Sequence, residues 1–180
     1  MTPHEVDWDI AGFVPITSWE KMGQAGFLCT EVSSEYGGLG GDFLYSVIVI
    51  EELTLTGQNG LIAPLHSDIV VPYITSYASD ALKKKYLPGC VSGDIVTAVA
   101  MTEPGAGSDL AGISTSAVED GGEVVLNGSK TFITNGILAD LLVVAARDPE
   151  VADPYQAITL YLVETQTPAI EKGRRLKKKG

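Results

Sequence analysis

The chain has 180 residues, of which 12 are basic and 23 acidic, so its formal net charge at neutral pH is −11. Hydrophobic residues make up 45% and charged residues 19%, a composition that permits a buried core and excludes an intrinsically disordered chain. The longest apolar runs, Val47–Ile50 and Leu141–Ala146, are far shorter than the ~20 residues of a membrane-spanning helix. The sequence indicates one full globular domain or two small ones, with no membrane insertion.

Charge is unevenly distributed along the chain. Six of the 12 basic residues lie in the last nine positions, which leaves a strongly acidic body. Such a body repels nucleic-acid phosphates, so we expect no nucleic-acid partner. Met1–Asp7 shows neither a secretion signal nor an Arg-rich presequence. Cys29 and Cys90 lack C-x-x-C spacing, which favours unpaired thiols in a reducing compartment.

The first helix signals lie near residue 17. Thr17-Ser18-Trp19-Glu20 matches a capping box, which predicts a helix over 17–25 that stops at Gly26. The stretch 35–41 is rich in glycine and predicts a loop. We therefore expect a short helix and then a turn-rich connection.

Two further helices are predicted before residue 78. Asp42 is placed to cap the first, and the glycine-containing stretch 57–60 ends it. The next apolar stretch predicts a helix that begins near Pro64. Since proline removes one helical hydrogen bond, we expect a kink at Pro72.

The last predicted helix ends near residue 90, and a strand is predicted after it. Ser79 predicts the start of a short helix over Asp80–Tyr86, which Leu87-Pro88-Gly89 is expected to close. The next segment, Ile95–Met101, is rich in β-branched and apolar residues and predicts a strand.

The second half of the chain reads as β structure. Asn127-Gly128 stands between two strand-like runs, Glu123–Leu126 and Lys130–Thr134, and predicts a two-residue hairpin turn. Two more strands are predicted over Leu141–Ala146 and Ala157–Val163.

Helices followed by strands indicate an α+β fold with two segregated parts rather than an alternating Rossmann sheet. We expect an N-terminal helical domain over 1–94 and a β-domain over 95–180. Because only about five strands appear, the expected antiparallel, barrel-like β-domain is incomplete.

The densest candidate for chemistry is Met101–Asp109, directly after the first predicted strand. Gly105 and Gly107 leave main-chain N–H groups uncovered by side chains. With the hydroxyls of Thr102 and Ser108, these donors suit an anion or a planar polar ring. The residues alone equally allow a glycine-rich surface turn.

Other motifs are weaker. A dinucleotide fingerprint fails because Leu110 stands where its third glycine belongs, and a phosphate loop fails because Ser129 precedes the lysine of Gly128–Thr131. His4 and His66 lack partners at ligand spacing, so we expect no metal site and interpret both as surface or packing residues. No serine nucleophile motif is present.

Seven segments of the chain, taken in order, resemble the acyl-CoA dehydrogenase family and most nearly its long-chain members. They are Trp19–Gly23, Glu35–Gly38, Tyr86–Pro88, Ala100–Leu110, Leu126–Lys130, Phe132–Gly136 and Lys172–Arg174. The resemblance extends from about Pro15 to the last residue, and its most specific part is Thr102–Asp109.

The resemblance implies a flavoprotein in which FAD lies against the middle β-domain and accepts a hydride from the β-carbon of an acyl-CoA. The counterpart of Thr102 hydrogen-bonds the isoalloxazine ring, and Ser108 lies where flavin phosphate and acyl-CoA substrate approach. The implied flavin-binding residues are Val99, Met101, Thr102, Gly107, Ser108, Phe132, Ile133 and Thr134. From the residues alone, 132–134 is core by default.

Family members continue into strands that complete the β-domain and then into a C-terminal helical bundle with the glutamate base and the tetramer contacts. The family's first helix, upstream of Pro15, is not evident in Met1–Ile10. We therefore interpret the chain as a fragment that lacks the C-terminal helical domain and is inactive alone. No catalytic base is assigned in it, since Glu103 belongs to the binding turn.

The resemblance further implies FAD-dependent α,β-desaturation of acyl-CoA in fatty-acid β-oxidation by a homotetrameric complete protein. The expected electron acceptor is an electron-transfer flavoprotein. The expected location is the bacterial cytoplasm, or the mitochondrial matrix in a eukaryote. Two alternatives stay open: a flavin oxidase or monooxygenase of the same superfamily, and a non-catalytic binding module.

Overall fold

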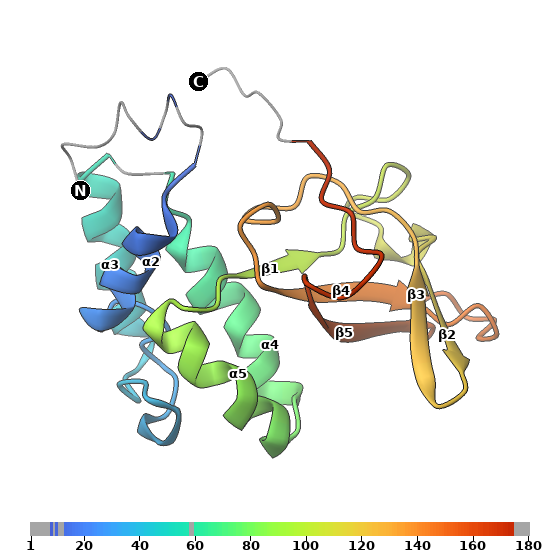
Figure 1. The fold of residues 1–180 in the computed structure, drawn as a ribbon, viewed down its shortest axis with the longest axis horizontal. Coiled ribbons are helices and arrows are strands. Elements are labelled where there is room, and N and C mark those ends of the chain that lie inside the picture. The colour runs from blue at the N-terminus through green and yellow to red at the C-terminus, as the bar shows by residue number, and fades with distance from the viewer. Residues whose placement is uncertain (1–7, 9, 11–12, 58–59, 175–180) are drawn as a thin grey trace. The chain divides into compact units, whose positions relative to one another are not determined.

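The computed structural model describes residues 8, 10, 13–57 and 60–174. The chain divides into two compact units, Met1–Thr97 and Ala98–Gly180, the first helical and the second built around a sheet (Figure 1). His4 and most of Met1–Ile10, where the sequence shows no first helix, lie outside the described residues. Among the described helices, none has the length and apolar character needed to cross a membrane.

The helical unit contains six described elements. They are α2 (Ile16–Gln24), the 3-10 helix η2 (Ser34–Tyr36), α3 (Phe43–Leu55), the π-helix η3 (Leu65–Val70), α4 (Val71–Tyr77) and α5 (Asp80–Ser92). The predicted caps of α3 and α5 are confirmed, because the Asp42 carboxylate and the Ser79 hydroxyl accept main-chain N–H bonds. The capping box is wrong: α2 begins after Pro15, which places Thr17 inside the helix.

The predicted end of α5 at Leu87-Pro88-Gly89 is also wrong. The helix continues through Pro88 to Ser92 and stops at Gly93, which has a left-handed φ of 82°. Proline costs this helix one main-chain hydrogen bond. Burial of Leu87 just before the proline, and of Cys90 and Val91 after it, outweighs that cost.

The helix predicted near Pro64 is present but irregular. Pro64 directly precedes the π-helix η3, and α4 follows η3 directly with Pro72 in its first turn. Because Pro72 has no N–H to donate, the wider hydrogen bonding of a π-helix just before it replaces a regular α-helical path.

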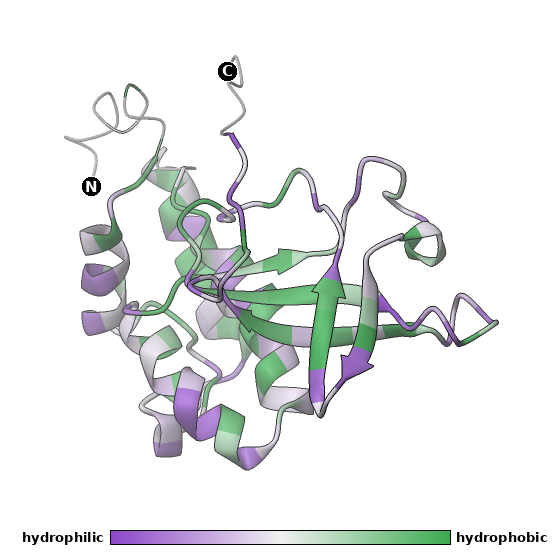
Figure 2. Cartoon of the chain, turned by 45° about the vertical axis from the view of Figure 1, so that its right-hand side comes forward, coloured by the Kyte–Doolittle hydropathy of each residue, from purple (hydrophilic) through white to green (hydrophobic). Residues whose placement is uncertain are grey.

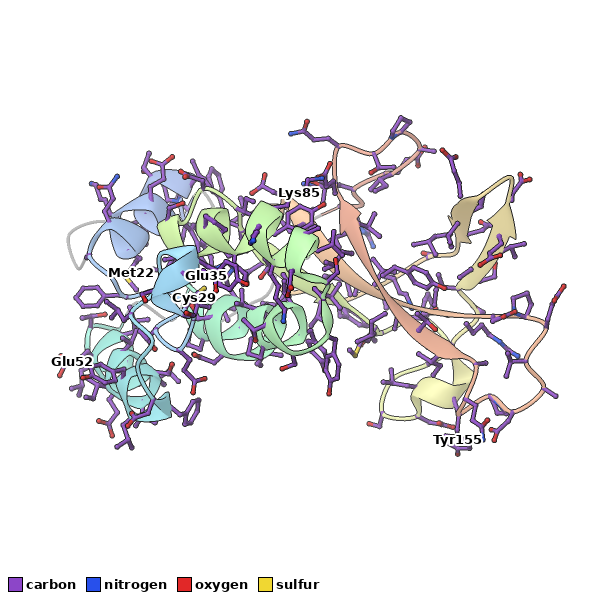
Figure 3. The ribbon with its side chains drawn as sticks, turned by 90° about the horizontal axis from the view of Figure 1, so that it is seen from below. Met22, Cys29, Glu35, Glu52, Lys85 and Tyr155 are labelled. Carbon is purple, nitrogen blue, oxygen red and sulfur yellow. The ribbon has the colours of Figure 1, made fainter. Side chains whose placement is uncertain are left out.

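A buried polar cluster lies in the core of the helical unit. His66 is fully buried; its Nδ1 accepts the Thr97 main-chain N–H at 3.1 Å, and its Nε2 lies 3.0 Å from the Cys90 carbonyl oxygen. The Trp19 ring meets the imidazole edge-on at 5.5 Å. Cys29 Sγ lies 3.4 Å from Nε2, so the fold supplies a cysteine neighbour that the sequence spacing did not suggest. Figure 3 shows Cys29 inside this unit, whereas Glu52 lies at its surface.

The second unit is built on five strands. They are β1 (Thr97–Ala100), β2 (Ser116–Asp120), β3 (Glu123–Asn127), β4 (Leu141–Arg147) and β5 (Ile158–Glu164). Their order is β1-β4-β2-β3, with β5 also paired to β4. The pairs β2–β3 and β4–β5 are antiparallel, and β2 meets β4 in a short parallel contact. This open sheet after a helical unit confirms the predicted α+β fold. The strands are mostly hydrophobic, and polar residues lie at their ends and in their connections (Figure 2).

The predicted hairpin at Asn127-Gly128 is wrong. The tight turn lies at Gly121-Gly122, whose φ angles of 60° and 88° are those of a two-residue hairpin, and it joins β2 to β3. Lys130–Thr134 is not a strand. Gly128 has a different role, because a Cβ at this position would collide with Thr115.

Candidate functional site

The turn that follows β1 is a closed structure rather than an open loop. The Glu103 N–H donates to the Ala106 carbonyl at 2.8 Å, and the Ala106 N–H returns a bond to the Glu103 carbonyl at 3.2 Å. Ala106 is buried with Ile113 and Ala145 in a small core of the sheet unit. The base of the turn is therefore fixed, and Pro104 and Gly105 form its exposed tip.

The Glu103 carboxylate lies inside this turn and accepts five hydrogen bonds. One oxygen accepts from the Ser114 N–H and hydroxyl, each at 2.7 Å. The other accepts from the Thr115 N–H at 3.0 Å, from the Thr115 hydroxyl, and from Lys130 Nζ at 2.8 Å. The Glu103 side chain is only 3% exposed, so these bonds replace its hydration almost completely.

The protonation state of Glu103 follows from this environment. Burial by itself would raise the pKa of the carboxyl, but the hydrogen bonds from Lys130, Thr115 and Ser114 outweigh it and hold the pKa well below its usual range. Glu103 is therefore ionised and saturated with donors at neutral pH. Such a carboxylate is a poor proton acceptor, which agrees with leaving it out of the catalytic roles.

Lys130 connects the turn to the segment 128–134. Its ammonium donates to Glu103 and, at 3.1 Å, to the Met101 carbonyl. The Thr131 N–H donates to the Thr102 carbonyl at 2.9 Å, directly beside this pair. The structure thus joins the two segments that carry the predicted site residues.

The predicted site residues differ in exposure. Five of them are partly exposed, namely Val99, Met101, Thr102, Ile133 and Thr134. The other three, Gly107, Ser108 and Phe132, are exposed. The default core interpretation of 132–134 is wrong for Phe132, which is 72% exposed and has a φ of 56°. A bulky residue in this left-handed region is strained, and such strain concentrates at functional sites.

Unused hydrogen-bonding groups line both segments. Within the part of the chain that the structure describes, the hydroxyls of Thr102, Ser108 and Thr134 make no hydrogen bond. Gly105 and Gly107 have no positive φ, and a Cβ added at either would meet no atom within 4 Å, so this chain's own packing does not require glycine at these places. An external polar ligand needs hydroxyl donors of this kind that have no partner within the protein, next to main chain that no side chain covers.

The hydrogen-bonding role of Glu103 was missed at the level of sequence. Its partners Ser114, Thr115 and Lys130 lie 11 to 27 residues away, and no local pattern links them to Glu103. Among the described residues, there is no group of three or more His, Cys, Asp or Glu side chains that could hold a metal ion.

Family models match both units. The model for the acyl-CoA dehydrogenase N-terminal domain matches residues 1–94, and the model for the middle domain of the same family matches residues 98–180. The chain belongs to the acyl-CoA dehydrogenase family.

Individual relatives agree with this assignment. The chain is 45% identical over 179 residues to a mitochondrial long-chain specific acyl-CoA dehydrogenase of Sus scrofa, a match that covers 99% of this chain and 42% of the relative. An acyl-CoA dehydrogenase structure from Geobacillus kaustophilus is 54% identical with a TM-score of 0.94, covering 98% of this chain and 47% of that one.

A third relative is a glutaryl-CoA dehydrogenase from Mycobacterium smegmatis in complex with FADH2. It is 29% identical with a TM-score of 0.83, and the match covers 93% of this chain and 42% of that one. This acyl-CoA dehydrogenase chain therefore spans less than half the length of the relatives it matches.

The residues of the site fit a flavin. The polar edge of an isoalloxazine ring needs hydrogen-bond donors, which the Thr102 and Thr134 hydroxyls offer. Its plane needs an apolar or aromatic neighbour, which Phe132 offers. The main-chain N–H groups of the exposed residues Gly107 and Ser108 suit phosphate oxygens.

Proposed function

We propose that this chain is the FAD- and acyl-CoA-binding part of an acyl-CoA dehydrogenase that desaturates acyl-CoA thioesters at the α,β position in fatty-acid β-oxidation. The observation that supports this most directly is the joining of Met101–Thr102 to Thr131 by Lys130 and a main-chain bond, beside three free hydroxyls. The long-chain name of the Sus scrofa relative supports the substrate class.

Eight residues of the sheet unit are proposed to hold FAD. The Thr102 hydroxyl and the main chain near Met101 would bind the polar edge of the ring, and 132–134 would pack along it. Ser108 would lie at the phosphate and acyl-CoA. The set is Val99, Met101, Thr102, Gly107, Ser108, Phe132, Ile133 and Thr134.

When bound, FAD supplies the hydride acceptor of the family's reaction. This chain's own residues would bind and orient it, and their donors would favour negative charge at the polar edge of the ring. No proton-abstracting base is assigned among the described residues, because Glu103 is saturated by its five donors. The proposed partners are an acyl-CoA substrate, an electron-transfer flavoprotein as acceptor, and further copies of the complete protein in a tetramer.

The test compares two threonine variants of the chain. Thr102→Ala removes the proposed ring donor, and Thr159→Ala removes an exposed hydroxyl of β5 as a matched control. FAD affinity, measured by quenching of flavin fluorescence, is expected to fall about tenfold or more in Thr102→Ala and to stay unchanged in Thr159→Ala. Equal affinity in all three proteins would contradict the assignment of Thr102.

A further inference from the structure

Two segments far apart in the sequence carry the proposed flavin contacts, and neither is a strand or a helix. Residues 101–109 follow β1, and 128–134 follow β3. Loops lose their conformation easily unless something ties them down. A preformed site on these two segments therefore needs side chains that fix one segment against the other.

The Glu103–Lys130 ion pair stands where the two segments meet. Lys130 Nζ lies 2.8 Å from the Glu103 carboxylate and 3.1 Å from the Met101 carbonyl oxygen. The two side chains are 3% and 11% exposed, so solvent screens the pair little. The bond from Lys130 thereby fixes the main chain at Met101. This residue directly precedes Thr102, the proposed donor to the flavin ring.

The carboxylate also holds a third segment. Its four bonds from the N–H and hydroxyl groups of Ser114 and Thr115 tie it to the residues just before β2. Gly128 packs its main chain directly on Thr115, which brings the start of the 128–134 segment to the same point. Three stretches of chain thus converge on one buried charge.

We propose that Glu103 and Lys130 are positioning residues that preform the flavin-binding surface, by locking the main chain of Met101–Thr102 to that of Thr131–Thr134 before the cofactor binds. This inference rests on the proposed function, because it assigns the preformed surface to flavin. The pair touches no reacting atom; it acts through the carbonyl of Met101 and the bond between Thr131 and Thr102.

A buried pair of this kind is costly to break on one side only, because the remaining charge loses its partner in a dry site. Lys130→Met is the milder variant, since Glu103 keeps its bonds from Ser114 and Thr115. Glu103→Gln is the harsher one. Lys172→Met serves as a matched control, because Lys172 Nζ likewise donates to two main-chain carbonyls of this unit, those of Ile137 and Ala139.

The first measurement is amide hydrogen exchange on the flavin-free chain. Glu103→Gln is expected to speed exchange at Ser114, Thr115 and Thr131 by about tenfold or more, and Lys130→Met is expected to do so at Thr131, while the β4–β5 amides keep their protection in both variants. Lys172→Met is expected to leave those three amides unchanged. Unchanged protection in both pair variants would overturn the proposal, and retained β4–β5 protection shows that each variant is folded.

The second measurement is FAD binding by the same proteins. In the pair variants FAD affinity is expected to fall about tenfold or more, and the visible band of the flavin that still binds at saturation is expected to change shape, which a loss of stability alone would not cause. Faster exchange with unaltered affinity and spectrum would overturn the positioning role. Absence of FAD binding by the unaltered chain would instead overturn the proposed function, and the exchange result would still decide whether the pair locks the loops.

Discussion

The Thr97 main-chain N–H donates to Nδ1 of His66 at 3.1 Å, so the imidazole proton lies on Nε2, facing the Cys90 carbonyl. Burial lowers the pKa of His66 to about 4, and the hydrogen bond to the Cys90 carbonyl only partly offsets this. The folded chain therefore holds a neutral histidine at a pH where an unfolded chain would already be protonated.

This difference predicts acid destabilisation of the helical unit. Since the pKa of His66 is lower in the folded than in the unfolded state, stability is complete above about pH 6.5 and falls as the pH drops toward 4. The full loss from this group is roughly 3 kcal/mol. Urea unfolding at several pH values would show it. In His66→Gln, this part of the pH dependence should disappear; an identical slope in both proteins would contradict the assigned burial.

Both cysteines are expected to be unreactive in the folded chain. Cys29 and Cys90 are buried and form no disulfide bond within the described residues, and burial raises the pKa of the Cys29 thiol to about 12. Because the thiolate is the reactive form, an aromatic disulfide reagent should modify both residues only as fast as the chain opens. Release of the coloured product should be slow in buffer and rapid in denaturant. A fast phase in buffer would place one thiol at the surface.

Gly107→Ala should separate ligand binding from stability. A Cβ at Gly107 meets nothing in this chain and its φ is not left-handed, so stability is expected to stay equal or rise by about 0.4–1 kcal/mol. FAD affinity is expected to fall, because the new methyl group would occupy the proposed phosphate surface. Gly173→Ala, at another glycine with free space around it, is the control. Equal FAD affinity in both variants would count against Gly107 as a contact residue.

Helix α3 predicts self-association of this chain. Most of its residues are apolar, yet only Ser46 and Leu53 are buried, and five of its large apolar side chains are more than half exposed: Phe43, Leu44, Tyr45, Ile48 and Leu55. Exposed apolar surface of this extent drives association. Sedimentation velocity should show oligomers that Leu44→Glu combined with Ile48→Glu reduces and Glu52→Gln does not. A monomer at every concentration would contradict this prediction.

Local chemistry predicted much of the helical unit. The Asp42 and Ser79 caps follow from side chains that bond neighbouring N–H groups, and such signals are visible in sequence. The predicted end of α5 at Pro88 was wrong because burial of Leu87 and Cys90, a tertiary effect, stabilises the helix beyond the proline. The turn at Gly121-Gly122 was missed because Asn127-Gly128 offered an equally good local signal, and the contact of Gly128 with Thr115 is tertiary.

In the candidate site, too, local sequence predicted some features, whereas others depend on tertiary contacts. The glycine turn with free hydroxyls at Thr102 and Ser108 could be anticipated from residue types. The role of Glu103 could not, because its burial depends on donors that the fold brings from Ser114, Thr115 and Lys130. Nor could the exposure of Phe132 be anticipated, because it depends on a left-handed main-chain conformation that aromatic residues rarely adopt.

The most direct test of the central claim is the visible absorption spectrum of the purified chain after incubation with FAD and desalting. The proposed site predicts retained flavin bands in the unaltered chain and weaker bands in Thr102→Ala at equal protein concentration. A colourless unaltered chain, folded by circular dichroism, would contradict the claim that 99–108 and 132–134 form a flavin site in this protein.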